Sequence, residues 1–99
     1  MAKEVKWTKT AAKNFGKTVD YLLENWPDKV VSDFIHKTDE MLLLLSEHPE
    51  LGEIQDKKRE IRGILLSVHN KLFYRVEHNR LIILKIFDTR QNPKKLRFR

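Results

Sequence analysis

The sequence predicts an α+β fold in which an antiparallel α-helical hairpin packs on one face of a mainly antiparallel β-sheet. Three observations lead to this class: a short alternating segment at the start, apolar residues at helical spacing up to about His48, and three β-branched and aromatic runs in the second half. The expected order of elements is therefore strand, helix, helix, strand, strand, strand.

The first two elements are a short strand and a helix. Residues 4–7 alternate polar and apolar side chains, and Thr8 follows as a helix N-cap. Apolar residues then recur at steps of three and four, at Ala12, Phe15, Val19, Leu22, Leu23 and Trp26. The first strand must join an edge of the sheet, because the later strands pair with one another in sequence.

Pro27 ends the first helix and also fits the first turn of a second helix. The helical spacing continues to about His48, and the residues 48–52 that follow stop the helix. A connection this short predicts that the two helices lie antiparallel as a hairpin. Residues 53–58 are polar and are expected to form a loop.

The second half predicts a three-stranded antiparallel meander over residues 61–68, 72–77 and 81–87. His69-Asn70 and His78-Asn79 separate the strands, and asparagine tolerates the positive φ of tight turns. With two-residue turns, the face under the helices carries Gly63, Leu65, Ser67, Leu72, Tyr74, Val76, Leu81, Ile83 and Phe87, with Lys85 as its only charge. The opposite face carries Arg62, Ile64, Leu66, Phe73, Arg75, Glu77, Arg80, Ile82, Leu84 and Ile86. A three-residue turn would invert part of this assignment.

Length and composition indicate one domain over residues 1–99, of which 90–99 form a basic tail that is expected to be extended or mobile. The chain has no cysteine, which excludes disulfides and thiolate chemistry and favours a reducing cytoplasm. The longest aliphatic run, Met41–Leu45, is far shorter than the ~20 residues that span a bilayer. No membrane segment and no export signal are therefore expected.

Charge is segregated along the chain. Residues 1–56 hold seven lysines and eleven acidic residues, a net charge of −4, whereas residues 57–99 hold thirteen basic and three acidic residues, a net charge of +10. Such an asymmetry attracts phosphodiesters or an acidic protein. The alternative is a basic surface whose lysines are merely solvated.

The motifs of the common enzyme classes are absent from the sequence. It contains no Gly-rich phosphate loop, no HExxH and no nucleophile elbow, and it predicts neither a metal site nor a cofactor. The four histidines, His36, His48, His69 and His78, are dispersed and are interpreted as structural or solvent-exposed. The exposed aromatics of a single-strand stacking platform are scarce, with Phe73 alone well placed.

Basic residues on or beside the predicted strands are the candidate functional groups: Arg59, Arg62, Lys71, Arg75, Arg80, Lys85 and Arg90. Cations on a rigid sheet can bind a nucleic-acid backbone or stabilise the charge that develops when a ribose 2′-hydroxyl attacks its own phosphate. A nuclease of this kind needs no metal. The alternative is a cross-strand charge cluster of Arg62, Glu77 and Arg80 on a solvated face.

These elements together resemble the RelE/ParE superfamily of bacterial toxins. The resemblance covers nearly the whole chain and rests on a hairpin ending in His-Pro-Glu-Leu-Gly, the basic strand Arg-Glu-Ile-Arg-Gly at residues 59–63, and the strand Lys-Leu-Phe-Tyr-Arg-Val at residues 71–76. An aliphatic strand that leads to Arg90 completes it. The resemblance implies the toxin of a type II toxin–antitoxin pair, neutralised by a cognate antitoxin.

Two activities occur in this superfamily: RelE-like members cleave mRNA on the ribosome, and ParE-like members block DNA gyrase. By resemblance, the catalytic candidates of a RelE-like enzyme are Arg62, Lys71 and Arg90, and Arg59, Arg75, Arg80 and Lys85 are candidates for binding RNA or another target. Ile64 stands where a second lysine is expected, and neither a tyrosine nor a histidine follows His78 for proton transfer. Asp88 could serve as a base but would repel the phosphate.

The missing proton-transfer group favours a ParE-like growth inhibitor that acts on DNA gyrase. The alternatives are a RelE-like ribosome-dependent mRNA endonuclease, a non-toxic nucleic-acid-binding module and a toxin relic that retains only antitoxin binding. The expected partner is an acidic antitoxin that covers the apolar helical stripe, including Trp26 and Leu44, and the cationic sheet face. A homodimer or a toxin–antitoxin hetero-oligomer is compatible with the sequence.

Overall fold

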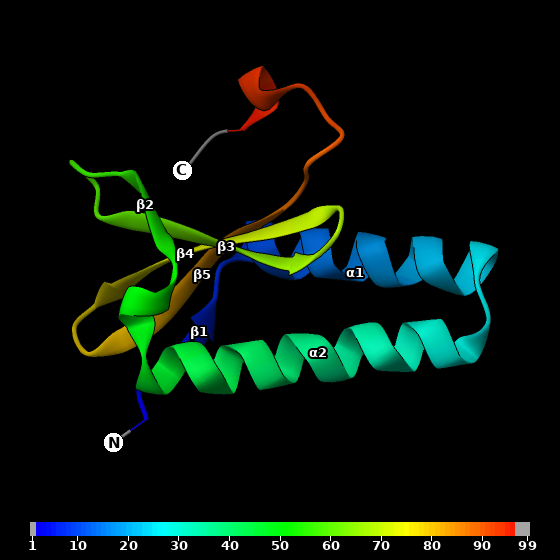
Figure 1. The fold of residues 1–99 in the computed structure, drawn as a ribbon, viewed down its shortest axis with the longest axis horizontal. Helices are drawn as coiled ribbons and strands as arrows, with labels where there is room; N and C mark the ends of the chain where they lie inside the picture. Colours follow the sequence, from blue (N-terminus) through cyan, green and yellow to red (C-terminus); the bar gives the residue numbers. More distant parts are fainter. Residues whose placement is uncertain (1, 97–99) are drawn as a thin grey trace.

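A computed structural model describes residues 2–96 and confirms the α+β class. Five strands form one sheet in the order β1-β5-β4-β3-β2, and the helices α1 (Lys9–Asn25) and α2 (Asp28–Glu47) form a hairpin on one face of it (Figure 1). The strands are β1 (Glu4–Trp7), β2 (Glu53–Asp56), β3 (Ile61–Ser67), β4 (Asn70–Glu77) and β5 (Arg80–Asp88). Two short 3₁₀ turns, η1 (Pro49–Leu51) and η2 (Pro93–Lys95), complete the fold.

The first strand and the helix that follows it form as predicted. β1 lies at one edge of the sheet and pairs in parallel with β5, with Glu4 opposite Arg80 and Trp7 opposite Ile83. Thr8 caps α1, because its Oγ1 accepts a hydrogen bond from the Ala11 amide at 3.0 Å. The same hydroxyl donates to carbonyl oxygens of β5, so one threonine fastens the start of the helix to the sheet.

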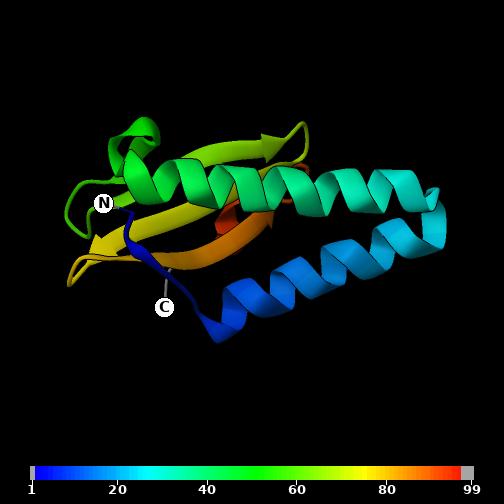
Figure 2. The ribbon, with the colours of Figure 1, turned by 90° about the horizontal axis from the view of Figure 1, so that it is seen from below.

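The helical hairpin touches the sheet along only part of its length. The buried helical residues of the main core, Ala11, Leu42 and Leu45, come from the open end of the hairpin. The closed end at Pro27 projects beyond the strands (Figure 2). The part of the hairpin nearest this closed end therefore has no strand of residues 2–96 beneath it.

One strand was not predicted. Residues 53–58 were expected to be a loop, but Glu53–Asp56 forms β2, which pairs antiparallel with β3 and closes the second edge of the sheet. Its only aliphatic residue, Ile54, is about half exposed. Periodicity could not reveal this strand, because a short edge strand that buries little apolar surface has a polar sequence.

The register of the sheet corrects the predicted faces. Tyr74 lies opposite Ile83 and faces the helices as predicted, as do Leu72 and Leu81. On β3 the assignment is inverted, because Leu66 and Ile64 contact the helical core in place of Leu65 and Gly63. In the middle of β5, a bulge at Leu84 exchanges the residues that follow it, so Ile86 faces the helices, whereas Phe87 and the predicted helix-facing Lys85 do not.

The β3–β4 connection, and not the β4–β5 turn, explains why the faces of β3 are inverted. The β4–β5 turn is the expected two-residue turn, with φ of 51° at His78 and 59° at Asn79. In the β3–β4 connection, Asn70 instead belongs to β4, lies opposite Ser67 and donates its side-chain amide to the Ser67 hydroxyl. The register then shifts between Ser67 and Leu65, which reverses the faces of β3.

A second, smaller apolar cluster covers the sheet face opposite the helices. Ile61, Phe73 and Phe87 form it, and Leu84 and Leu96 pack against it. The segment after Arg90, which the sequence predicts to be extended or mobile, forms η2 and brings Leu96 to this cluster. Residues 97–99 of the same prediction lie outside the described residues.

Candidate functional site

Two cavities concentrate the charged residues of the protein. The first has a volume of about 590 Å³ and lies beside η1, where it is lined by Lys3, Pro49, Glu50, Ile54, Lys57, Glu60, Arg62, Tyr74, Arg75 and Val76. We call it the η1 cavity. The second is larger and lies between the hairpin and the edge of the sheet.

Hydrogen bonds of two side chains hold the η1 turn on the sheet. The hydroxyl of the buried Tyr74 donates to the Pro49 carbonyl at 2.6 Å and accepts from the Gly52 amide at 2.9 Å. Burial raises the pKa of the Tyr74 phenol, so it remains a protonated donor at neutral pH. Arg62 Nη1 donates to the carbonyl oxygens of Glu50 and Gly52, at 3.2 and 2.7 Å.

Most other cations of the η1 cavity also have partners. Arg75 Nη2 lies 2.7 Å from a carboxylate oxygen of Glu77, and Lys3 Nζ donates to the Asn79 side chain at 3.0 Å. Buried Nε of Arg75 has no hydrogen-bond partner in the described residues. The Lys57 ammonium also lines the cavity but has no hydrogen-bond or ion-pair partner among residues 2–96. The η1 cavity is therefore a region where arginines serve mainly to hold the protein together.

The second cavity, which we call the hairpin groove, has a volume of about 720 Å³. Helical residues on one side and residues of β5, the β3–β4 connection and the C-terminal segment on the other form its walls: Asn14, Lys17, Thr18, Tyr21, Leu22, Trp26, Val30, Asp33, Phe34, Lys37, Ser67, Val68, His69, Asn70, Lys85, Ile86, Phe87, Asp88, Arg90, Gln91 and Lys95. β1 pairs only with Arg80–Ile83, so the second half of β5 is a free edge at this groove. Asn14 covers part of it by accepting a hydrogen bond from the Ile86 amide.

The charge of the hairpin groove is positive and largely unneutralised. Four ammonium groups line it without a hydrogen-bond or ion-pair partner among residues 2–96, those of Lys17, Lys37, Lys85 and Lys95. The two carboxylates are each near another cation, because Asp33 lies 3.6 Å from Lys29 and Asp88 forms a bidentate pair with Arg90 at 2.8 and 3.0 Å. An anionic ligand would thus meet free cations.

Two exposed aromatic side chains also line the groove. Tyr21 is 51% and Trp26 54% exposed, although both come from the amphipathic helix. Phe73, the aromatic residue that the sequence suggested as the exposed stacking surface, is only 2% exposed and belongs to the second apolar cluster. Among the described residues, the most exposed aromatics therefore lie on the helical hairpin, and on the sheet only Trp7 of the edge strand β1 is exposed, at 36%.

The three predicted catalytic residues do not line one cavity. Arg62 lines the η1 cavity, Arg90 lines the hairpin groove, and Lys71 lines neither. Lys71 Nζ instead donates to the Gln55 side chain at 3.2 Å and lies 5.5 Å from the centre of the Phe73 ring. Neither of the two cavities therefore brings all three cations together.

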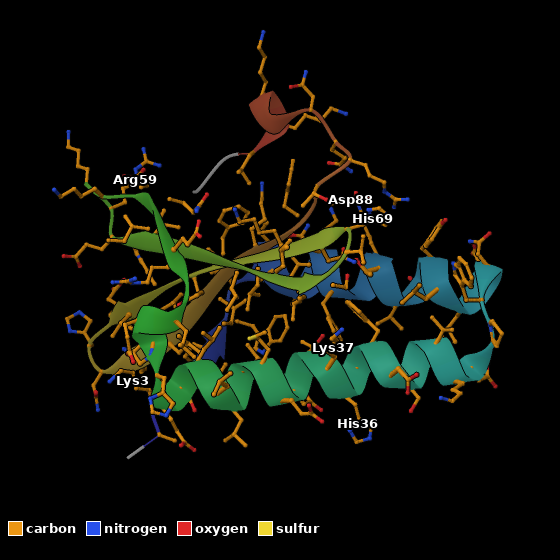
Figure 3. The ribbon with its side chains drawn as sticks, in the orientation of Figure 1. Lys3, His36, Lys37, Arg59, His69 and Asp88 are labelled. Atoms are coloured by element: carbon orange, nitrogen blue, oxygen red, sulfur yellow. The ribbon has the colours of Figure 1, made fainter. Side chains whose placement is uncertain are left out.

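The four predicted binding residues do not line one cavity either, although Arg75 and Arg80 both adjoin Glu77. Arg75 lines the η1 cavity and Lys85 the hairpin groove. Arg59 lies in the β2–β3 turn, where its side chain is 3.8 Å from Asp56, at the corner away from the groove (Figure 3). Arg80 lies at the start of β5, opposite Glu77.

Sequence reasoning missed several groove residues. Lys17, Lys37 and Tyr21 belong to the acidic half of the chain, where they look like ordinary residues of amphipathic helices. His69, interpreted as a turn residue, lies beside Asp88 (Figure 3). The Thr89 amide donates a hydrogen bond to the main-chain carbonyl oxygen of His69 at 2.9 Å. The Arg90 hydrogen bonds hold the pKa of Asp88 below its usual range, which makes this carboxylate a weak base.

Neither a metal centre nor a membrane span is found in the described part of the chain. Residues 2–96 contain no group of three or more His, Asp or Glu side chains placed to hold a metal ion. No helix among them is long and apolar enough to cross a membrane.

The fold is similar to solved toxin structures. A chromosomal ParDE toxin–antitoxin system from P. aeruginosa matches with a TM-score of 0.72 and 17% identity, over 88% of this chain and 96% of that one. A YoeB/ParE toxin from Agrobacterium tumefaciens matches with a TM-score of 0.65 and 12% identity, over 86% and 96% of the two chains. The toxin–antitoxin complex RelBE2 from Mycobacterium tuberculosis matches with a TM-score of 0.58 and 17% identity, over 89% and 99%. At these identities the similarity establishes the fold alone.

A search of curated protein sequences gave no significant match. A family of sequences does match, described as the ParE toxin of the type II toxin–antitoxin system parDE, and the match spans residues 5–93. Because it extends over nearly all of the strands and helices described above, the chain belongs to the ParE toxin family of type II toxin–antitoxin systems.

Proposed function

We propose that this toxin arrests bacterial growth by binding DNA gyrase, without cleaving RNA. The observation that carries this proposal is the separation of Arg62, Lys71 and Arg90, because metal-free RNA cleavage requires its cations around one phosphate. In addition, Arg62 Nη1 already donates hydrogen bonds to two backbone carbonyls of the η1 region. An inhibitor that acts by binding needs no such convergence.

Within the described residues, the groove also lacks a strong general base for the proton transfer that RNA cleavage requires. Asp88 is held as a carboxylate by Arg90, and its lowered pKa reduces its strength as a base. His69 is the imidazole nearest to this pair, but it lies on the β3–β4 connection, far from Arg62 in the η1 cavity. Both features support a binding mode of inhibition.

The proposed regulator is an acidic antitoxin encoded beside the toxin. Its carboxylates would pair with the free lysines of the hairpin groove, and its apolar side chains would cover Trp26. Leu44 is 44% exposed but does not line the groove, so an antitoxin that covers both residues must extend along the hairpin. Opposite charge would speed this association at low ionic strength.

The proposal is tested by expressing the toxin alone from a repressed promoter and mapping mRNA 5′ ends in the arrested cells. A second assay measures supercoiling by purified gyrase with the purified toxin. We expect inhibited supercoiling by purified gyrase in the presence of the toxin, together with an unchanged set of mRNA 5′ ends. New 5′ ends at codon-spaced positions with unaffected supercoiling would overturn the gyrase proposal in favour of RNA cleavage. Normal growth at high toxin levels, with folding confirmed by circular dichroism, would overturn toxicity itself.

A further inference from the structure

We infer that the hairpin groove binds single-stranded nucleic acid directly, with bases stacked on Tyr21 and Trp26 and phosphates paired with the lysines. This inference goes beyond gyrase inhibition, which requires no nucleic acid in this groove. It rests on the joint presence of free cations and exposed aromatic rings in one cavity of about 720 Å³.

The lysines supply the affinity for phosphate. Lys17 and Lys37 come from the two helices, and Lys85 and Lys95 from the opposite wall, so a strand in the groove would meet ammonium groups on both sides. None of the four has a partner among residues 2–96, so no ion pair must be broken to bind a phosphate. Each phosphate contact would release counterions from the strand.

The aromatic rings supply a contact that a cationic groove alone does not have. Tyr21 and Trp26 remain about half exposed in a hairpin whose other large rings, Phe15 and Phe34, stack on each other with centroids 5.6 Å apart. Stacking of a base on an aromatic ring stabilises single-strand complexes and needs no particular base sequence. Exposed rings and free lysines in one groove are the combination that such complexes use.

The same rings distinguish a single strand from other anionic ligands, namely a duplex and an acidic peptide. A duplex keeps its bases stacked inside and offers no base face to Tyr21 or Trp26. An acidic peptide can pair with the lysines but has no flat ring system to lie on both aromatics. The rings therefore allow the free toxin to bind a single strand in the groove that the proposed antitoxin would otherwise occupy. The test must distinguish stacking on the rings from pairing with the lysines alone.

The test is fluorescence anisotropy of the full-length toxin with labelled oligo(U) and oligo(dT) of about 12 nucleotides, a length typical of single-strand sites. If four phosphates are neutralised, the affinity should fall about 50-fold between about 50 and 200 mM salt. Comparison of the two oligonucleotides distinguishes RNA from DNA as the ligand. Equal binding at both salt concentrations would overturn the inference.

Matched variants separate stacking from charge. Tyr21→Ala and Trp26→Ala should each weaken binding about ten-fold, whereas Leu23→Ala, which removes a side chain of similar 54% exposure from α1, should leave it unchanged. Lys85→Gln should reduce the salt dependence, but Lys57→Gln, the same change in the η1 cavity, should not. Circular dichroism controls for folding.

Tryptophan fluorescence gives a second readout. The chain has two tryptophans, and a base stacked on Trp26 should quench part of the emission, while the Trp26→Ala protein, which retains Trp7, should show no quenching. A poly-glutamate peptide provides the competing arm. Because the proposed antitoxin is acidic and uses the same lysines, poly-glutamate is expected to compete with oligo(U) through charge alone, and only the oligonucleotide should lose affinity in the Tyr21→Ala and Trp26→Ala proteins. If neither aromatic substitution changes the affinity for oligo(U), no base stacks in the groove and the inference is wrong.

Discussion

The η1 cavity and the hairpin groove hold similar numbers of cations but use them differently. In the η1 cavity, Arg62 donates to two main-chain carbonyls and Arg75 pairs with Glu77. In the hairpin groove, lysines such as Lys37 and Lys85 have no partner within residues 2–96. The planar guanidinium suits fixed hydrogen bonds, and the flexible ammonium remains available for a ligand. The comparison shows that the partners of a cation, more than its presence, indicate where a ligand binds.

The comparison also changes what the charge asymmetry means. Much of the +10 charge of residues 57–99 lies on arginines that stabilise turns and strands, including Arg62 and Arg90. The groove takes Lys17 and Lys37 from the acidic half of the chain. Net charge by segment therefore favours an anionic partner but gives no location for it.

The largest expected difference between the two regions is in stability, and two tyrosines test it. Tyr74→Ala removes a fully buried ring and its bonds to Pro49 and Gly52, so it should lower the free energy of unfolding by about 3–5 kcal/mol. Tyr21→Ala, at a half-exposed position in the groove, should change it by less than about 0.5 kcal/mol. Urea unfolding measures both. Equal losses would mean that the groove is as much a part of the core as η1.

A smaller effect is expected for the cations. Arg62→Ala should cost about 2 kcal/mol of unfolding free energy, because the Glu50 and Gly52 carbonyls lose a charged donor, whereas Lys85→Ala should cost less than about 0.5 kcal/mol. Arg62→Lys should recover only part of the loss, since an ammonium does not reproduce the guanidinium fork. If Arg62→Ala were fully stable and lost toxicity instead, Arg62 would be a functional residue.

Much of the fold could be predicted from the sequence because its signals are local. Thr8, Pro27 and the positive φ at Asn79 mark boundaries through the chemistry of single residues. The faces of β3 could not be predicted, because the bulge near Leu66 depends on how Asn70 pairs with Ser67. A shift of one residue in a strand reverses every side chain on it.

The candidate site was less predictable than the fold. The sequence proposes Arg90 as a catalytic and Lys85 as a binding candidate because both lie on or beside a basic strand, and both line the hairpin groove. Tyr21, Lys17 and Lys37 reach the same cavity because the closed end of the hairpin projects past the sheet. This overhang depends on how the elements pack, and no spacing within the helices encodes it.

The next prediction concerns the rate of antitoxin binding and rests on the proposed partner. A Lys37→Glu and Lys85→Glu double variant should associate with the cognate antitoxin about ten-fold more slowly at low salt, because both positions line the groove. Lys57→Glu in the η1 cavity should have little effect. Stopped-flow measurement at increasing salt should bring the rates together as charges are screened. A slower rate for Lys57→Glu than for the double variant would place the antitoxin at the η1 cavity.

The smallest expected effect is a pH dependence confined to the groove. The pKa of Asp88 is lowered from about 3.8 by its hydrogen bonds from Arg90, so the pair stabilises the folded state above that pH. As the pH falls through the lower pKa of the folded state, the carboxylate is protonated and this stabilisation is lost. The natural protein should therefore be slightly more stable than Asp88→Asn at pH 6. This difference in unfolding free energy should disappear as the pH falls below about 4. Arg90→Gln should behave in the same way, because it removes the other half of the pair. A difference that stayed constant down to pH 2, or that grew in acid, would show that Asp88 stabilises the groove by something other than its charge.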